Sequence, residues 1–473
     1  IGRDFEYDLM AQISFLSEAA LKEDLQELIN QRIIEIKEIK NREVYTFKHA
    51  LLKEAAYLSV TQAKKKEYHS RIAEILEKNN SNPNEQYFME LSKHYAGALD
   101  YEKAISIGID AATSFLNKAS LLEAITLSFE MLDWIDLYQN TKKEEFRLQI
   151  HRILTQALMG SHGWADSKVK KYLDISRSLL DEIGESRHYG PILCSLMTYH
   201  YVSSNRKELK CISEEVMHHA VVISDIGLEI AGKMFYGLWA HGAGEYEEAE
   251  ACFEYALSHY DPVEHKNHGE LLGIDTRAWS YATLALVKWF RNDSANAVLF
   301  SDKGVAWARE LNHIPSLCIS LLYKANLCHY RGNREEALEI VEELNKYAET
   351  YNLPAYKAYG QIMLAWIKKN PEKAEAEIKM LEEMGCTAAL SYYRSLLADT
   401  YADQGRYDLA VDNIKACLLL CESNDEYYYQ FELLRLEFLY LSKMTPPKTE
   451  EAAKVLEKAK TVAFSQGIIC TNF

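Results

Sequence analysis

Residues 237–256 read GLWAHGAGEYEEAEACFEYA, and the spacing of small residues in this stretch decides the fold. Gly237 is followed by Gly244 and then by Ala249, with larger apolar residues between them. Small residues at such positions let two antiparallel helices approach closely, and a glycine in the turn adopts the left-handed backbone that joins them. The stretch therefore predicts one helix, a tight turn and a second helix packed on the first.

The same spacing recurs at three further places: Ala285, Asn292 and Ala297; Ala325, Gly332 and Ala337; and Ala398, Gly405 and Ala410. Two weaker matches to the repeat pattern pair Tyr95 with Ala104 and Ala119 with Ala124. Repeated helix pairs of this kind are the tetratricopeptide pattern, and they stack into a superhelix because a single pair cannot bury both of its faces. We therefore expect an all-α fold with a tetratricopeptide-like helical-repeat superhelix.

The beginning of the chain has a different pattern. Ser17 is placed to cap a helix over residues 18–30, β-branched residues then flank a polar turn at residues 40–42, and another helix is expected over residues 48–59. The order helix, helix, hairpin, helix is typical of a winged-helix domain. The predicted domains are a small winged-helix domain with a β-hairpin at 1–77, a polar linker at 78–86 and the helical repeats at 87–473.

Composition favours a helical protein of the cytoplasm. The 20 Gly and 8 Pro make up 28 of the 473 residues, and so few turn formers favour long helices joined by short loops. The nine cysteines are odd in number and include no Cys-x-x-Cys pair, which favours a reduced, cytoplasmic compartment. No apolar run approaches the length of a membrane span, so we expect no membrane association. Because the chain opens at Ile1 within a predicted helical domain, we expect it to be part of a longer polypeptide.

The charge distribution disfavours nucleic acid as a partner. The chain carries 53 Lys and Arg against 70 Asp and Glu, a net charge of −17. The first 75 residues hold 12 of the basic and 13 of the acidic residues, so the remainder carries 41 minus 57, or −16, and its field repels phosphate. Lys64-Lys65-Lys66 is the only basic run in those first 75 residues, whereas a DNA-binding domain is expected to be clearly basic.

The motifs of nucleotide and metal chemistry are missing from the sequence. A phosphate-binding loop needs Gly-Lys followed by Ser or Thr, and the one Gly-Lys here is followed by Met234. Zinc helices, calcium loops and the Gly-x-Ser-x-Gly elbow are also absent. His265 and His268, near Glu264 and Glu270, are residue types that bind metals, but we interpret them as solvated loop histidines. We therefore expect no catalytic residue, no metal and no cofactor.

Six groups of residues, taken in order, carry a family resemblance: Ile1 to Phe5; Tyr45 to Leu51 with Ala55-Ala56-Tyr57; Ala157-Leu158-Met159 with Gly163-Trp164; Tyr260-Asp261-Pro262 with His265; Gly273-Ile274-Asp275; and Ala306 to Leu311. Together they resemble the winged-helix and tetratricopeptide region of large bacterial signalling proteins. Those proteins join a class III adenylyl or guanylyl cyclase, an AAA-like STAND ATPase and a tetratricopeptide region. The similarity covers nearly the whole chain and is specific in combination.

The resemblance implies a regulatory arm. In such proteins the ATPase acts as a switch, the winged helix packs against it, and the repeats receive a ligand or partner. The cyclase and ATPase modules are not in this sequence, so the resemblance implies a non-catalytic sensory and protein-interaction region that acts on upstream modules of the same polypeptide. Two other functions stay open: the sensor region of a DNA-binding STAND-type transcription regulator, and part of an active NTPase or cyclase. A homo-oligomer also stays open.

The first helix of each tetratricopeptide pair lines the concave side, so counting from the small residues places particular side chains there. The predicted concave residues are Met234, His241, Trp279, Trp289, Asn326, His329, Tyr330, Tyr392 and Asp399. Aromatic anchors with an acidic flank suit an amphipathic or basic peptide. A whole protein or a small effector stays open as the partner. The alternative is that these aromatics pack on neighbouring helices or on the ATPase module.

Overall fold

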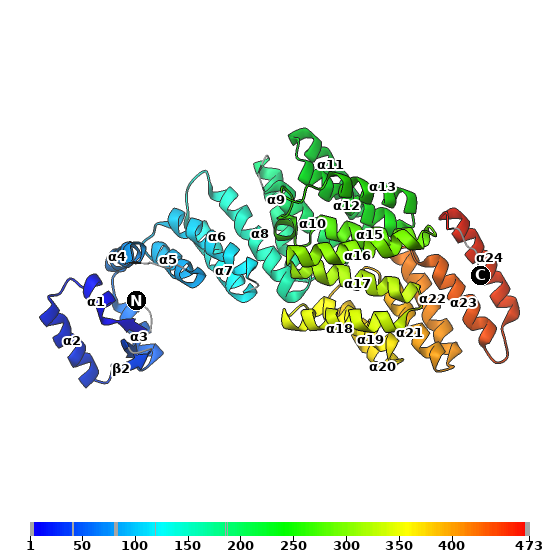
Figure 1. Ribbon diagram of the computed structural model, residues 1–473. Coiled ribbons are helices and arrows are strands. Elements are labelled where there is room, and N and C mark those ends of the chain that lie inside the picture. Colours follow the sequence, from blue (N-terminus) through cyan, green and yellow to red (C-terminus); the bar gives the residue numbers. More distant parts are fainter. Residues whose placement is uncertain are drawn as a thin grey trace. The chain divides into compact units, whose positions relative to one another are not determined.

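The computed structural model describes residues 4–39, 42–79, 84–118, 120–184, 186 and 188–468. Contacts within the chain divide it into two compact units, Ile1–Ile153 and Leu154–Phe473, and the division falls within helix α8 (Lys143–His162). Figure 1 shows helices in both units, and in the described residues the strands are confined to the first.

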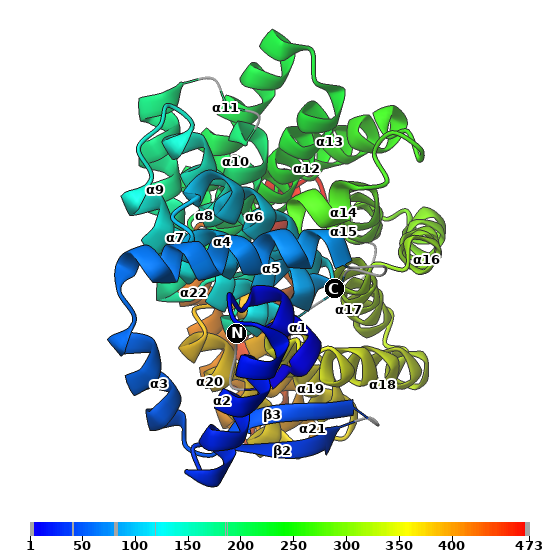
Figure 2. The same cartoon turned by 90° about the vertical axis from the view of Figure 1, so that its left-hand side faces the viewer.

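The first unit begins with a small antiparallel sheet flanked by helices (Figure 2). Its strands are β1 (Asp4–Glu6), β2 (Ile34–Ile39) and β3 (Arg42–Phe47), in the order β1-β3-β2. β2 and β3 form the predicted hairpin, although residues 40–41 of its turn lie outside the described residues. Strand β1 is not predicted from the sequence, because three residues are too few to show an alternating pattern and the strand depends on its pairing with β3.

Four helices accompany the sheet: α1 (Tyr7–Ile13), α2 (Glu18–Asn30), α3 (Ala50–Ser59) and α4 (Gln62–Asn79). Helix α2 has its predicted bounds, and the hydroxyl of Ser17 caps it by accepting a hydrogen bond from the backbone N–H of Ala20 at 3.3 Å. The core of this part consists of Phe5, Leu21, Leu25 and Ile34. The winged-helix class remains a prediction, which the element order supports.

Helices α5 (Glu85–Gly97), α6 (Tyr101–Asn117), α7 (Leu121–Leu137) and the first part of α8 complete the first unit. The predicted linker has helical ends, because α4 extends to Asn79 and α5 begins at Glu85; residues 80–83 lie outside the described residues. Tyr95 and Ala104 lie on neighbouring helices and are buried, whereas Ala119 lies outside the described residues. The domain boundaries stay predictions.

The second unit is a stack of antiparallel helices (Figure 1). After the end of α8 its helices are α9 (Ser167–Ile183), α10 (Tyr189–Val202), α11 (Arg206–Ile223), α12 (Ile226–Ala243), α13 (Tyr246–His259), α14 (His268–Leu272), α15 (Thr276–Phe290), α16 (Ser294–Leu311), α17 (Ile314–Tyr330), α18 (Arg334–Thr350), α19 (Pro354–Ile367), α20 (Pro371–Glu383), α21 (Leu390–Asp403), α22 (Tyr407–Asn424), α23 (Gln430–Lys443) and α24 (Thr449–Ser465).

The four predicted helix pairs are confirmed, and they are α12–α13, α15–α16, α17–α18 and α21–α22. Their turn residues all adopt the left-handed backbone, with φ of +80° at Gly244, +63° at Asn292, +70° at Gly332 and +75° at Gly405. The small residues on both sides of these turns are at most 1% exposed: Ala249, Ala285, Ala297, Ala325, Ala337, Ala398 and Ala410. The repeat spacing in the sequence therefore marks the places where paired helices pack closely.

A further pair, α19–α20, lies between the third and fourth predicted pairs and was not found from the sequence. Its left-handed turn residue is Lys369, with φ of +56°. Because a search for Gly or Asn at the turn passes over lysine, the repeat lacks the signal that marks its neighbours.

Two parts of the second unit that are far apart in the sequence are joined by backbone hydrogen bonds. The backbone N–H groups of Thr387 and Ala388 both donate to the carbonyl of Val202 at 2.9 Å, and the N–H of Tyr427 donates to the carbonyl of Gly242 at 2.7 Å. These bonds join the C-terminal ends of α10 and α12 to the loops that precede α21 and α23. The superhelix therefore closes on itself, and we call this junction the seam.

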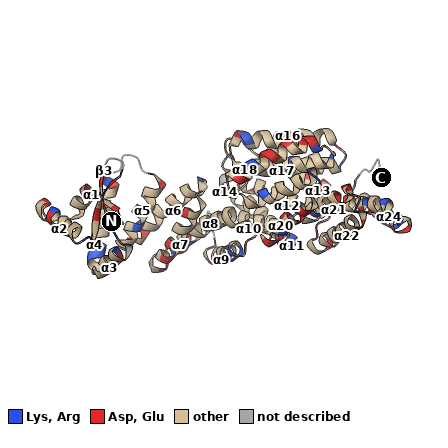
Figure 3. Ribbon diagram, turned by 90° about the horizontal axis from the view of Figure 1, so that it is seen from below, with Lys and Arg blue, Asp and Glu red and all other residues tan. Residues whose placement is uncertain are grey.

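Charged residues of both signs are interspersed along the helices, for example on α16 (Figure 3). None of the helices in the described ranges is both long and apolar enough to cross a membrane. The eight cysteines that the structure describes are all free, and seven of them are buried while Cys211 is exposed.

Candidate binding site

An open hollow of about 560 Å³ lies among the first helices of successive pairs in the second unit. We call it the groove. It is lined by aromatic, apolar and charged residues: Trp289, Phe290, Asn292, His329, Tyr330, Gly332, Arg334, Trp366, Asp399, Tyr429, Phe431, Glu432, Arg435, Leu436 and Ile468. Its wall combines aromatic and apolar side chains with convergent polar and charged groups, and ligand sites also combine apolar walls with placed polar groups.

The nine predicted concave residues separate into three groups. Trp289, His329, Tyr330 and Asp399 line the groove. A second, more enclosed space, which we call the cavity, is lined by His241, Trp279 and Asn326. Met234 and Tyr392 line neither space, because their side chains are buried between helices at 1% and 0% exposure. Whether any of these residues binds a ligand stays a prediction.

A chain of polar contacts crosses one wall of the groove. Nε2 of His329 lies 3.2 Å from Oδ2 of Asp399, and Nδ1 of the same ring lies 3.2 Å from the hydroxyl of Tyr392. The hydroxyl of Tyr440 donates to the other carboxylate oxygen of Asp399, and burial together with that carboxylate raises the pKa of Tyr440. These contacts fix the orientation of the imidazole and the carboxylate, so both present a defined surface to the groove.

Two arginines supply positive charge to the groove. Arg334 donates to Asp403 at 2.6 Å, and its guanidinium lies 4.7 Å from the centre of the Trp366 ring. Arg435 donates through Nε to Glu432 at 2.8 Å. The lining therefore carries Arg334 and Arg435 against Asp399 and Glu432, which makes its fixed charges balanced.

Two polar atoms of the groove lack a partner among the described residues: the hydroxyl of Tyr330 and Nε1 of Trp366. The Trp366 side chain is only 3% exposed, so its indole N–H is a buried donor. Tyr330 stacks on Tyr429 with ring centres 5.6 Å apart and also packs against Phe290 at 5.2 Å. Buried polar groups are normally hydrogen-bonded, so these two atoms mark places where a ligand or water completes the groove.

Several lining residues of the groove could not be predicted by counting along the sequence. Arg334 begins the second helix of its pair, a position that counting along first helices does not reach. Trp366 lies on the unrecognised α19, and Tyr429 lies in the loop before α23. The signal for Trp366 would have been the repeat length, because the third and fourth predicted pairs are separated by enough residues for one more pair.

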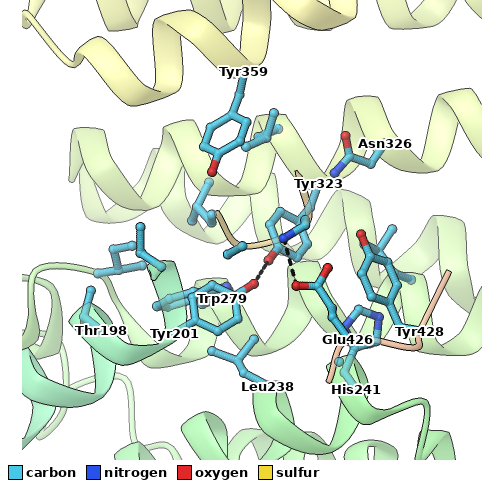
Figure 4. Close-up of a pocket in the computed structure, with 18 of the residues that line it drawn as sticks. Thr198, Tyr201, Leu238, His241, Trp279, Tyr323, Asn326, Tyr359, Glu426 and Tyr428 are labelled. Atoms are coloured by element: carbon cyan, nitrogen blue, oxygen red, sulfur yellow. Dashed lines mark hydrogen bonds between the residues drawn. The ribbon is translucent and has the colours of Figure 1, made fainter. Parts of the chain in front are cut away.

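The cavity lies at the seam and has a volume of about 70 Å³. Figure 4 shows Tyr201 and Trp279 on one side of it and Glu426, His241 and Tyr428 on the other. The hydroxyls of Tyr201 and Tyr323 lie 2.8 Å apart. The cavity is thus walled by tyrosines from widely separated parts of the chain.

Two buried charges of opposite sign line the cavity. Arg206 is 7% exposed and donates to the backbone carbonyl of Trp239, while Glu426 is 5% exposed and accepts from the N–H of Ala389 at 3.1 Å. Burial raises the pKa of Glu426, and Arg206 acts in the opposite direction. Burial also lowers the pKa of His241 to about 3, with Arg206 adding to the effect, so this imidazole is neutral at pH 7.

The histidines of the loop between α13 and α15 are buried, which corrects the expectation that they are solvated. His265 and His268 are 9% and 7% exposed. His265 accepts from the N–H of Asp261 at 2.9 Å, and His268 lies 2.9 Å from the hydroxyl of Thr276. The loop folds inward around Asp275, whose carboxylate caps α15. No group of three or more His, Cys, Asp or Glu residues in the described ranges is arranged to hold a metal ion.

Comparison with known proteins gives a fold and no family. No family model and no curated protein matches the chain. Among solved structures, a Rap protein in complex with competence and sporulation factor has a TM-score of 0.54 at 10% identity, covering 77% of this chain and 94% of that chain. The Rap conjugation regulator of plasmid pLS20 in complex with the Phr* peptide has a TM-score of 0.51 at 14% identity, covering 72% and 96%.

A STAND protein with a tetratricopeptide repeat sensor from Pyrococcus horikoshii is also similar, at 17% identity over 85% of this chain and 63% of that chain, with a TM-score of 0.38. The likenesses to the two Rap structures show the fold. The chain is an all-α protein with a tetratricopeptide-like helical-repeat superhelix, as its sequence predicts.

Proposed function

We propose that this chain is a non-catalytic regulatory and protein-interaction region, and that its repeat superhelix binds a peptide segment of a partner in the groove. The observation that carries the proposal is the groove itself. It combines aromatic side chains, two arginines, two acidic residues and unpartnered buried donors in one open space of about 560 Å³. The two Rap structures with bound factor or peptide have the same fold, and this supports a peptide as the ligand.

The lining chemistry favours an amphipathic peptide. The half-buried ring of Trp289 offers an apolar anchoring surface, and such surfaces usually dominate the binding energy of a peptide. Because the charges that line the groove are balanced, the groove itself can pair with either a basic or an acidic residue of the peptide. At longer range, the net charge of −16 beyond residue 75 attracts a peptide with a basic flank. We therefore propose apolar anchors with a basic flank as the recognised pattern.

The wider context follows the family resemblance. We propose that peptide binding in the groove biases a STAND-type ATPase and a cyclase module of the same polypeptide, located in the cytoplasm. The described residues present no cluster for metal binding and the sequence no phosphate-binding loop, so we expect no turnover of ATP or GTP by this chain alone.

Fluorescence anisotropy with synthetic peptides tests the proposal. The probes are three short labelled peptides: alternating Leu and Lys, alternating Leu and Glu, and alternating Ser and Lys. We expect the Leu/Lys peptide to bind best, because only it has both anchors and a basic flank. Trp289→Ala should abolish this binding, whereas Phe464→Ala, a change at a residue 90% exposed on α24 and outside the groove, should not alter it. Equal binding by Trp289→Ala and the wild type would refute the proposal.

A further inference from the structure

The cavity at the seam has polar atoms that the protein leaves unsatisfied. Nε of Arg206, Nε2 of His241 and Oδ1 of Asn326 find no hydrogen-bond partner among the described residues. The three side chains are between 5% and 7% exposed, so solvent at the surface does not satisfy them. Because native proteins rarely leave such atoms unpaired, the contents of the cavity must be polar.

The size of the cavity sets the size of its contents. A water needs about 10–15 Å³ of such space, so 70 Å³ accommodates roughly five water-sized groups. This is room for a small organic molecule of a few heavy atoms and too little for a peptide.

The charges of the cavity set the chemistry of its contents. Arg206 and Glu426 reach it from different parts of the superhelix, the first from the start of α11 and the second from the loop before α23. Each is anchored from behind by the protein, Arg206 through the Trp239 carbonyl and Glu426 through Ala389 and the hydroxyl of Ser391. A ligand with one negative and one positive end would satisfy both charges at once.

The aromatic walls suit the positive end of such a ligand. Tyr201, Tyr323 and Tyr428 line the cavity together with Trp279, and aromatic faces attract an ammonium group when it is removed from water. The free acceptor of Asn326 offers an additional hydrogen bond to ammonium, while the free N–H of Arg206 offers one to a carboxylate.

We propose that the cavity is a binding site for a small zwitterion, a free amino acid of a few heavy atoms, with its carboxylate toward Arg206 and its ammonium toward Glu426. The site lies apart from the groove and its occupation does not depend on the peptide function. Its two charged residues come from the two sides of the seam, so a bound amino acid connects two parts of the superhelix that are far apart in the sequence. The ligand thereby favours the closed form over an opened one.

Isothermal titration calorimetry on the full chain tests this site. The probes are glycine, alanine and β-alanine, with acetate and methylamine as compounds that carry only one of the two charges. We expect one equivalent of at least one amino acid to bind the wild type. Acetate and methylamine should bind roughly tenfold more weakly or worse, because each leaves one buried charge unsatisfied. Absence of heat from every amino acid at millimolar concentration overturns the proposal and leaves the cavity to ordered water.

Matched variants locate the binding. Glu426→Gln keeps the size of the side chain and removes its charge, and we expect it to weaken amino-acid binding by roughly tenfold or more. Glu437→Gln is the control, because Glu437 is also 5% exposed but does not line the cavity. If Glu426→Gln does not fold, Asn326→Leu, which removes the free acceptor, should weaken binding instead. Trp289→Ala should bind the amino acid normally even if it loses the peptide, so the two proposals fail separately. Unchanged affinity in the folded cavity variant would refute the site.

Discussion

The hydroxyl of Tyr246 donates a hydrogen bond to the backbone carbonyl of Tyr428, 182 positions further along the chain. Tyr246 begins α13 and is 1% exposed, and the ring of Tyr428 packs on His241 with centres 4.7 Å apart. Nearest-neighbour stacking of repeats does not require such a contact. The second unit is therefore held by its seam as well as by its stack.

We predict that Tyr246→Phe weakens the seam. The change removes one buried hydrogen bond and leaves the Tyr428 carbonyl unpaired, so the free energy of unfolding should fall by about 1–3 kcal/mol. Hydrogen exchange measured by mass spectrometry should show faster exchange of the Tyr427 and Tyr428 amides, which donate to Gly242. Tyr255→Phe is the control: its hydroxyl donates to Glu229 on the adjacent helix, away from the seam. Equal exchange at residues 427–428 in both variants would contradict the role of Tyr246.

We predict that substitution by asparagine lowers the stability much more at one repeat glycine than at another. A Cβ at Gly237 would lie 3.0 Å from the ring of Phe253, so Gly237→Asn should lower the free energy of unfolding by about 1–3 kcal/mol or more. Gly332 has φ of +70° and open space around it, and asparagine tolerates that backbone. Gly332→Asn should change the free energy of unfolding by less than about 1 kcal/mol. Urea denaturation measures both, and similar losses would contradict the close-approach explanation of the repeat spacing.

We predict that Tyr330 contributes mainly to the stability of the fold and Trp289 mainly to peptide binding. Tyr330 packs against Phe290, Tyr392 and Tyr429, so Tyr330→Ala should cost about 3–5 kcal/mol of stability. Trp289 is half-buried at the edge of a smaller cluster, and Trp289→Ala should cost clearly less while abolishing peptide binding. Thermal melting followed by circular dichroism compares the two variants. A large loss of stability in Trp289→Ala would show that this residue packs against neighbouring helices and does not bind the peptide, which is the alternative that the sequence leaves open.

We predict that the chain loses stability as the pH falls below about 6.5. Burial lowers the pKa of His241 to about 3 and of His268 and His313 to about 4. The unfolded chain binds protons at these histidines from about pH 6.5 downward, whereas the folded chain does not until about pH 4 or below. Each histidine therefore removes about 1.4 kcal/mol for every pH unit in that window. Burial also raises the pKa of Asp275, Glu426 and Glu437, which opposes the loss, but burial lowers the pKa of more histidines: His69, His94, His151, His200, His241, His268 and His313.

Melting temperatures from pH 7.5 to pH 5 measure this dependence. His241→Phe keeps an aromatic ring against Tyr428 and removes one titrating group, so the melting temperature of this variant should fall less steeply with acid. A pH dependence identical to that of the wild type would show that His241 is not a buried neutral histidine in solution.

Much of the repeat architecture was predictable because it depends on local spacing. The left-handed turns at Gly244, Asn292, Gly332 and Gly405 follow from residue types that adopt positive φ easily. The pair α19–α20 was not recognised in the sequence because its turn residue is Lys369. Lysine adopts the left-handed backbone here, but it is not a residue type that marks such a turn. The bounds of α2 followed from its Ser17 cap, whereas β1 needed a partner strand that only the folded chain supplies.

The candidate sites were predictable only in part. Counting along first helices selected nine side chains for the concave side, and four of them, Trp289, His329, Tyr330 and Asp399, line the groove. The same count could not tell which of them face open space, because that depends on how far the superhelix turns before the parts joined at the seam meet. Met234 and Tyr392, which the same count selected, are buried between helices.

The sequence by itself determined the helix pairs of this protein, since small residues, turn formers and apolar spacing act over one or two helices. Only the tertiary structure decided that residues from α11 and from the loop before α23 share one interior. Arg206 and Glu426 stand 220 positions apart, and no local pattern relates them. Their meeting follows from the summed rotation of every intervening pair, a quantity to which each packing contact contributes a little. The turns could therefore be predicted from individual residues, whereas the cavity and the groove depend on the whole superhelix.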